Sequence, residues 1–418
     1  MVKYHFRLFS FIYLTCITLL LNETFVSETD ENTAPQKSYQ PHFELKDGDR
    51  VVFLGNSLME KDLKHGYLEV ALTSRWPNQD ITFRNLGWSG DTVFGDARSY
   101  FTNPPSAYGH LVNQLNEAQP TVVFIAYGAN EASEGEAGIP GFSKGLNQLL
   151  TVIEDLEAKA ILLSPVPHFT KNDSDVKQSQ LQNENLKRYS EAISETALER
   201  DVRFINLFHS LIEIGKKFDI TTNGIHLNET GYYFLSSIIE TGLGLPSREW
   251  SAQVDVSDFT TWAKGATISD VKKDKDTGNI QFSIDDHYLP YPLPAHEQIT
   301  QNREIKMTGL NKGSYSLTVD GEYFITATSS EWSEGVKISN EPSYNQANHL
   351  RDLIVKKNEL YFHKYRPQNR TYLLGFRSHE QGHNAVELNQ FDSLIQKAED
   401  QIANYRMPNT NNYKLIRQ

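Results

Sequence analysis

The sequence is almost free of cysteine. Its one cysteine, Cys16, lies inside the apolar stretch at residues 8–21, near the start of a chain of 418 residues. If that stretch is removed on secretion, the remaining chain has no disulfide, no thiol nucleophile and no cysteine-ligated metal. The cysteine count therefore excludes a disulfide scaffold and a thiol enzyme.

Positive charge is also scarce. The chain has 40 Lys and Arg against 53 Asp and Glu, which gives a formal net charge of −13. This balance argues against nonspecific binding to nucleic acid, and we expect no nucleic-acid partner. Aromatic residues make up 11 % of the chain, which is typical of a globular protein and not of long disordered segments. The length allows more than one domain.

The longest apolar run is too short for an ordinary membrane span. It covers 14 residues, 8–21, where about 20 are typical of a spanning helix. Lys3 and Arg7 precede it, so residues 1–27 are predicted to be a signal peptide. We then expect a secreted or periplasmic protein without stable membrane insertion. An uncleaved anchor is the alternative, because no clean A-x-A cleavage site follows the run.

The middle of the chain alternates between strand-like and helix-like segments. A polar stretch at 28–46 is interpreted as a linker, and the alternation runs over 47–246. Short apolar runs occur at 50–55, 81–87, 121–128, 160–165 and 202–207, with helical stretches such as 141–158 and 181–200 between them. Strands buried on both faces and separated by helices predict one α/β domain with a parallel sheet.

Four polar segments occur at the ends of these strands or at the start of the last helix. Ser57 follows the first strand, "NLGWSGDT" (85–92) the second and "GANE" (128–131) the third, while "NGIHLNETGYYFLSSII" (223–239) opens the helix. The carboxyl ends of parallel strands meet at one edge of the sheet, where ligands bind. Each residue also has a structural interpretation: Ser57 as a helix N-cap, Asn130 as a turn residue and His226 as a core histidine.

Over residues 49–246 the sequence resembles the SGNH (GDSL-type) hydrolases, whose motif blocks occur in this order. The resemblance implies a three-layer α/β/α flavodoxin-like fold and an enzyme that hydrolyses ester bonds without a metal or other cofactor. It implies that Ser57 is the nucleophile and His226 the base. Gly90 and Asn130 match the glycine and asparagine whose N–H groups join the amide of Ser57 in the oxyanion hole.

The residue types suit this chemistry. A serine hydroxyl needs a neighbouring base, and histidine serves as one near neutral pH. Preorganised N–H donors stabilise the negative charge that develops on the carbonyl oxygen. Trp88, Tyr127 and Glu131 adjoin the motif residues and are predicted to contact the substrate. Asn228 is predicted to cap a helix over 229–241 and so to fix the loop that carries His226.

Two positions depart from the family pattern. The first block reads Gly55-Asn56-Ser57 where the family has Gly-Asp-Ser. Three residues before the histidine, where the family has its catalytic aspartate, this sequence has Asn223. An asparagine can hold the imidazole ring, but it cannot neutralise an imidazolium. We therefore expect a Ser–His dyad, a slow enzyme, or another acceptor such as a backbone carbonyl or Asp219.

A second motif points to different chemistry. "HEQGH" (379–383) matches the zinc-protease pattern H-E-x-x-H, with Glu387 as a third candidate ligand. The pattern requires a regular helix, and Gly382 inside it, with Pro367 and Gly375 before it, weakens helix formation. We therefore expect no metal site.

The alternation of strand-like and helix-like segments ends at Pro246. Residues 250–340 predict a small antiparallel β module with a hairpin at Asp320-Gly321, and residues 345–406 a helical segment. The aromatic-rich stretch 357–387 is interpreted as packing on the α/β domain through Tyr361, Phe362, Tyr365 and Leu373. A stronger version of this interpretation makes it a roof over the site.

The sequence thus favours a secreted esterase that removes O-acyl groups, acetyl in particular, from small-molecule or glycan esters. A thioesterase or lysophospholipase is the alternative, although no long apolar loop predicts a lipid tunnel. The substitution at Asn223 keeps open a third interpretation, a catalytically weak carbohydrate-binding protein on a hydrolase fold.

Overall fold

The computed structural model describes residues 42–98, 106–170, 176–295, 299, 301, 303–339, 341–375 and 377–418. The predicted signal peptide and most of the predicted linker lie outside the described residues. The end of that linker is part of the fold, because Leu45 is buried in the core and Phe43 donates its backbone N–H to Leu243 O at 2.9 Å. In the described part of the chain, no helix is long and apolar enough to cross a membrane.

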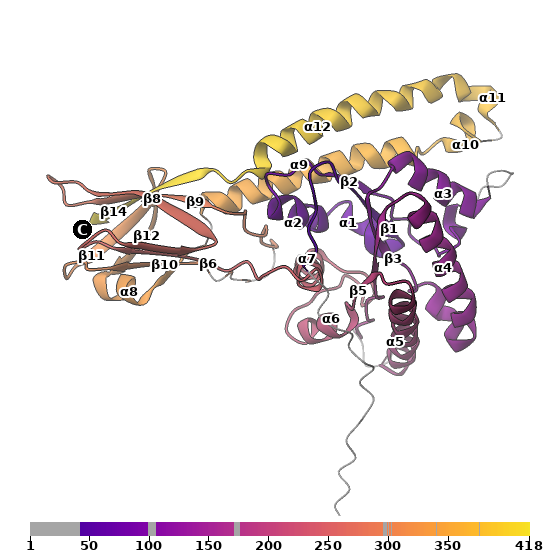
Figure 1. Ribbon diagram of the computed structural model, residues 1–418, viewed down its shortest axis with the longest axis horizontal. Helices are drawn as coiled ribbons and strands as arrows, with labels where there is room; N and C mark the ends of the chain where they lie inside the picture. The colour runs from indigo at the N-terminus through magenta and orange to yellow at the C-terminus, as the bar shows by residue number, and fades with distance from the viewer. Residues whose placement is uncertain are drawn as a thin grey trace, which may run out of the picture. The chain divides into compact units, whose positions relative to one another are not determined.

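A five-stranded parallel sheet forms the first part of the fold, with the strand order β2-β1-β3-β4-β5 (Figure 1). The strands are β1 (Arg50–Gly55), β2 (Thr82–Asn85), β3 (Val122–Ala126), β4 (Lys159–Leu163) and β5 (Arg203–Ile205). This confirms the predicted flavodoxin-like sheet. The chain reverses its direction of winding between β1 and β3, which is where such sheets place their ligands.

Helices cover both faces of this sheet. In β1 alternate residues enter opposite cores: Val51 and Phe53 one, Val52 and Leu54 the other. Helices α2, α6 and α7 contribute to the first core, and α3, α4 and α5 to the second. The helices of the domain are α1 (Ser57–Asp62), α2 (Tyr67–Arg75), α3 (Ala107–Ala118), α4 (Ile139–Asp155), α5 (Val176–Glu199), α6 (Phe208–Gly215) and α7 (Glu229–Gly242), with 3-10 turns η1 (Asp96–Arg98) and η2 (Glu131–Gly138).

Two further sheets make up the β module. One has the order β13-β10-β6-β7 and the other β12-β11-β14-β9-β8. The elements are β6 (Trp250–Asp255), β7 (Thr261–Lys264), β8 (Ala266–Lys273), β9 (Ile280–Asp286), β10 (Arg303–Thr308), β11 (Ser314–Val319), β12 (Glu322–Thr328), α8 (Ser329–Glu334) and β13 (Val336–Lys337). The predicted hairpin joins β11 to β12 through Asp320 and Gly321, both with positive φ. The module is not wholly antiparallel as expected, because β6 and β10 pair in parallel.

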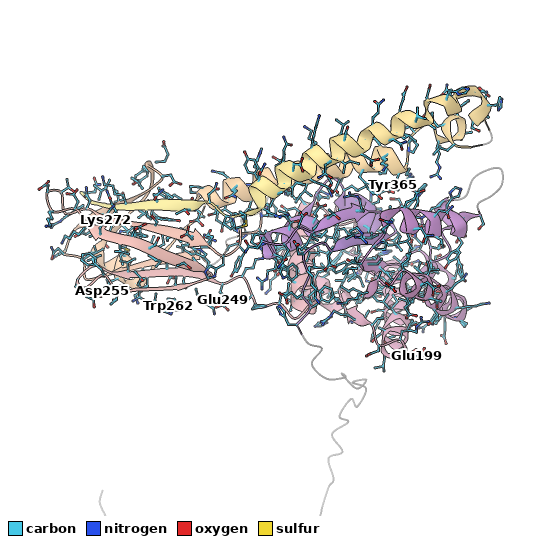
Figure 2. The ribbon with its side chains drawn as sticks, turned by 45° about the horizontal axis from the view of Figure 1, so that its top comes forward. Glu199, Glu249, Asp255, Trp262, Lys272 and Tyr365 are labelled. Carbon is cyan, nitrogen blue, oxygen red and sulfur yellow. The ribbon has the colours of Figure 1, made fainter. Side chains whose placement is uncertain are left out.

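The C-terminal segment links the two parts. It contains α9 (Pro342–Tyr365), α10 (Arg370–Leu373), α11 (Ser378–Gln381), η4 (Gly382–Asn389), α12 (Gln390–Arg406) and β14 (Thr410–Arg417). Helices α9 and α12 lie side by side (Figure 1). Strand β14, which was not predicted, inserts between β9 and β11 of the module. The C-terminal end of α9 contacts the α/β domain through Tyr365, which is labelled in Figure 2.

Candidate active site

A cavity of about 760 Å³ lies at the carboxyl ends of the sheet strands. Its wall is formed by the segments that follow β1, β2, β3 and β4, by the start of α5 and by the loop before α7. Six residues predicted for the site line it together: Ser57, Gly90, Tyr127, Asn130, Asn223 and His226. The parallel sheet thus brings four separate stretches of sequence into one space.

Ser57 is the first residue of α1, directly after β1. The N-cap of α1 is Asn56, whose side-chain oxygen accepts from the backbone N–H of Leu58 at 3.1 Å, so the hydroxyl of Ser57 is not the cap. Gly55 allows the close approach to β3, since a Cβ there would lie 2.5 Å from Ala126 O. Within the described residues the N–H of Ser57 has no acceptor, as is usual in the first turn of a helix, and it is available to a ligand.

Gly90 lies in the turn that follows β2, with φ of 82°. A Cβ at this position would meet nothing within 4 Å, so the glycine is needed for its left-handed backbone and not for space. The turn is held by the Trp88 N–H, which donates to Gly55 O at 2.9 Å, and by the Ser89 N–H, which donates to Glu60 Oε2 at 2.6 Å. No described group accepts from the Gly90 N–H, which leaves a second donor for the cavity.

Asn130 supplies a third donor. Its Nδ2 donates one hydrogen to Asp91 O at 2.6 Å, which orients the amide, and the second hydrogen of the same nitrogen remains. The Asn130 side chain is half-buried on the cavity wall. Three residues from three segments, each with an uncharged N–H donor, thus line the same cavity as the Ser57 hydroxyl, which is the composition of an oxyanion hole.

A buried ion pair supports the turn that carries Gly90. The Asp91 carboxylate lies 2.8 Å from Arg98 Nε, and both side chains are inaccessible to solvent. Tyr127 donates its hydroxyl to the same carboxylate at 2.8 Å, and Arg98 also donates to Leu86 O at 2.8 Å. Sequence reasoning missed Asp91 and Arg98, although Asp91 lies within the motif "NLGWSGDT" and so could have been suspected.

Two of the three predicted substrate contacts do not line the cavity. Glu131 is buried and accepts the N–H groups of Val93 and Gly128, each at 2.9 Å, so it braces the walls. Trp88 is buried beneath the guanidinium of Arg366, at 3.8 Å from the ring centre. Tyr127 does line the cavity, but its hydroxyl is bonded to Asp91 and not free for a substrate. We therefore correct the assignments of Trp88 and Glu131 to structural roles, and contact between Tyr127 and the substrate stays a prediction.

His226 lies on the loop before α7, which Asn228 caps as predicted by accepting from Gly231 N at 2.9 Å. Burial lowers the pKa of His226 below its usual value, and the positive charges of Lys61 and His168 lower it further. This shift favours the neutral imidazole, which is the form that a general base requires.

Asn223 decides which nitrogen of that ring carries the proton. Its Oδ1 accepts the backbone N–H groups of Ile225 (3.2 Å) and His226 (2.9 Å), and its Nδ2 lies 3.1 Å from His226 Nδ1. Because only the oxygen can accept from N–H, the NH₂ end must face the ring and donate to Nδ1. The neutral ring then carries its proton on Nε2, the nitrogen that would have to accept a proton from serine. Asp219, the other predicted acceptor for the His226 ring, accepts a hydrogen bond from the backbone N–H of Thr221 at 3.4 Å.

The H-E-x-x-H motif does not lie on one regular helix. Helix α11 ends at Gln381, and Gly382 begins the 3-10 segment η4. Glu380 forms an ion pair with Arg377. In the part of the chain that the structure describes, no three His, Cys, Asp or Glu side chains are grouped to hold a metal ion.

The comparisons with known proteins agree with this geometry. Residues 53–234 match the GDSL-like Lipase/Acylhydrolase family. No curated protein matches the sequence. Among solved structures, a gut microbial diltiazem-metabolizing enzyme is similar with a TM-score of 0.70 and 18 % identity, over 90 % of this chain and 99 % of that chain. That coverage extends the shared fold beyond the α/β domain.

Smaller structures match about half of the chain. An acetylxylan esterase from Geobacillus stearothermophilus, as a catalytic mutant, aligns over 49 % of this chain and 100 % of its own, with 16 % identity and a TM-score of 0.40. Another acetyl xylan esterase aligns over 46 % and 98 %, with 16 % identity and a TM-score of 0.36. The family match, the parallel sheet and the motif order together show that the α/β domain of this chain belongs to the GDSL-like lipase/acylhydrolase family of ester-hydrolysing enzymes.

Proposed function

We propose that this esterase removes O-acetyl groups from carbohydrate, with Ser57 as nucleophile and His226 as base. The observation that supports the roles is the meeting of the Ser57 hydroxyl, three uncharged N–H donors and a neutral imidazole in one cavity. We further propose that the protein acts in the periplasm or outside the cell, because Lys3 and Arg7 precede an apolar run of signal-peptide length.

In the proposed reaction the Asn223 amide first rotates, so that its oxygen accepts a hydrogen bond from His226 Nδ1–H and the proton leaves Nε2. Ser57 Oγ then attacks the ester carbonyl while the free Nε2 of His226 takes its proton. The carbonyl oxygen becomes an oxyanion that accepts hydrogen bonds from the N–H groups of Ser57 and Gly90 and from Asn130 Nδ2. The intermediate collapses, the C–O bond to the alcohol breaks, and the imidazolium returns its proton to the leaving oxygen. Water then attacks the acyl-serine by the same steps and releases the carboxylic acid.

The cavity wall supports a polar alcohol such as a sugar. Gln178, Ser179 and Gln182 of the first turns of α5 line the same cavity as the proposed nucleophile. Amides and hydroxyls of this kind donate to and accept from hydroxyl groups. The wall is mixed, with Phe169 and Ile225 as its apolar side, so an acyl chain of a thioester or lysophospholipid is the competing substrate.

The Asn223 amide supports a second candidate function. Because it donates to His226 Nδ1, the ring at rest offers a proton, and not a lone pair, at Nε2. A site in this state has no base for Ser57, so a hydroxyl-rich ligand that it held would not be turned over. The second candidate is therefore a carbohydrate-binding protein with weak catalysis.

The test is a panel of 4-nitrophenyl acetate, butyrate and palmitate together with acetylated oligosaccharides, on wild type and Ser57→Ala. We expect release of acetate from the glycans by the wild type and loss of at least about 10³-fold in the variant, with an unchanged circular dichroism spectrum. Preference for palmitate would favour the lipid esterase. Equal rates in both proteins would overturn the role of Ser57. Glycan binding without turnover would favour the weak catalyst.

A further inference from the structure

The wall of the cavity carries positive charge in an acidic protein. The chain has 13 more acidic than basic residues, yet none of the described residues that line the cavity is Asp or Glu. Lys61 lines it and supplies this charge, whereas burial lowers the pKa values of the neighbouring His168 and His226 and so favours their neutral forms. A cleft whose charges have one sign concentrates ligands of the opposite sign, and low-dielectric walls strengthen the effect.

Lys61 lies close to the proposed nucleophile. It is four residues after Ser57 within α1, and residues at this spacing lie on the same face of a helix. The Lys61 side chain is half-buried, and its positive charge is felt by His226. Within the described residues no carboxylate pairs with it. In contrast, the more deeply buried Lys357 and Arg248 pair with Glu69 and Glu240 of the α/β domain.

We propose that the substrate of this site carries a carboxylate, as the acetyl ester of a sugar acid does, and that Lys61 binds this group. The inference rests on the proposed esterase function. The lysine ammonium would then gain the partner that the chain does not supply. The amides of Gln178 and Gln182 remain for the hydroxyls of the same sugar.

The experiment compares esters in matched pairs that differ in one carboxylate. Acetylated glucuronate is compared with acetylated glucose for the alcohol part, and 4-nitrophenyl hydrogen succinate with 4-nitrophenyl butyrate for the acyl part. We expect the wild type to favour the anionic ester in kcat/KM by about tenfold to hundredfold in one of the two pairs, and the preference to shrink as salt is added. Lys61→Gln should reduce this ratio to about one.

Lys64→Gln is the matched control. Lys64 lies three residues further along, is exposed and does not line the cavity, so the same change of charge there should keep the ratio. A wild-type ratio near one in both pairs would overturn the proposal, as would an unchanged ratio in Lys61→Gln. Failure of the esterase function is distinguishable, because then no ester of either pair would be cleaved. Calorimetric titration of Ser57→Ala with glucuronate and with glucose measures the same preference without turnover.

An independent set of contacts joins the C-terminal helix to the turn that carries Gly90. Tyr365, the last residue of α9, donates its hydroxyl to Gly87 O at 3.0 Å. Arg366 lies 2.9 Å from Glu60 Oε2, the same oxygen that accepts the Ser89 N–H. The guanidinium of Arg366 also covers the ring of Trp88.

The turn is therefore enclosed between α1 and the end of α9. A Cβ at Gly87 would lie 2.2 Å from Glu60 N, so the turn has no room to move toward α1. Helix α9 is itself anchored on the domain, because Lys357 Nζ donates to Glu69 Oε2 at 2.7 Å and to Phe83 O at 3.0 Å, both in the interior.

We propose that Tyr365 and Arg366 are positioning residues, which act through the turn to hold the Gly90 N–H in place. None of the described residues after 340 lines the cavity, so the segment is a clamp on the oxyanion hole and not a roof over it. A donor that shifts by a fraction of an ångström loses much of its effect on the transition state, while the substrate in its ground state is bound as before.

The test is Arg366→Ala and Tyr365→Phe, with Arg366→Lys as the conservative variant. We expect kcat to fall about tenfold to hundredfold in Arg366→Ala with little change in KM, and Arg366→Lys to recover part of the loss. The affinity for a phosphonate that mimics the tetrahedral intermediate should fall by the same factor as kcat/KM. Lys364→Ala is the control, because Lys364 pairs with Asp392 of α12 and does not contact the turn.

A rise in KM at constant kcat would overturn this second proposal. An equal loss in Lys364→Ala would do the same, since it would show that any damage to α9 suffices. Thermal unfolding of each variant separates a loss of stability from a loss of geometry, and Arg366→Ala must be assayed well below its Tm.

Discussion

Replacement of Asn223 by aspartate should convert the resting site into one that accepts a proton. In the wild type the amide donates to His226 Nδ1, so the neutral ring carries its proton on Nε2. Catalysis then requires the Asn223 side-chain amide to rotate, so that its oxygen faces the ring. An aspartate at 223 keeps one oxygen on the two backbone N–H groups and offers the other to an Nδ1 proton, which leaves Nε2 free.

The geometry gives a rough size for the gain. Turning the amide breaks the bonds from the N–H groups of Ile225 and His226 to Oδ1, each worth about 0.5–1.5 kcal/mol net. Removing this cost of about 1–3 kcal/mol from the barrier corresponds to roughly a 5- to 150-fold rise in kcat. Stabilisation of the imidazolium adds to it, with a ceiling of about 10⁴, the effect of the Asp-to-Asn change in the serine-protease example.

The assay is steady-state kinetics on 4-nitrophenyl acetate across pH. A new carboxylate beside the ring should also raise the pKa of His226, so the acid limb of kcat/KM should move to higher pH than in the wild type. Asn228→Asp is the control, since it adds the same charge nearby at the cap of α7 without touching the ring. An unchanged kcat in Asn223→Asp would refute the argument that Asn223 sets the tautomer of His226. A fall in kcat would also refute the role of His226 as the base.

Three further predictions concern metal, pH and stability. Activity should survive a chelator, because the proposed chemistry uses only Ser57, His226 and N–H donors; loss that zinc restores would redirect attention to His379, Glu380 and His383. The acid limb of wild-type kcat/KM should lie below pH 6.5, since burial, Lys61 and His168 lower the pKa of His226 and only the neutral ring is a base, and a limb above 6.5 would contradict this. Burial raises the pKa of Asp62 to about 7, so its ionisation opposes folding: relative to Asp62→Asn, the wild type should lose up to about 1.4 kcal/mol of stability per pH unit between about pH 4 and 7. Urea unfolding of both proteins at pH 5 and pH 8 measures this, and a difference that does not grow with pH would count against it.

The sequence alone was enough for the parallel sheet and for the order of the site segments. Both follow from local patterns: β1 is apolar at successive positions because both of its faces are covered, and polar turns follow the strands. The cap at Asn228 and the hairpin at Asp320-Gly321 are equally local, since each depends on residues two or three apart.

The direction of side chains was decided only by the tertiary structure. Trp88 and Glu131 stand beside site residues in the sequence, yet they turn inward, because neighbours in a turn or strand face different sides. Strand β14 was missed for a related reason. Its partner strands β9 and β11 are far away along the chain, so no local sequence pattern reveals the pairing.

The state of the catalytic histidine also depends on contacts that spacing does not reveal. The sequence places an amide three residues before His226, but which end of that amide meets the ring is fixed by the two backbone N–H groups that occupy its oxygen. In the same way, Tyr365 and Arg366 contact the turn of Gly90 although they are more than 270 positions away from it in the sequence. Only the folded chain brings such distant residues together. Local periodicity determines which elements form, whereas hydrogen-bond partners and charge pairs exist only after those elements pack.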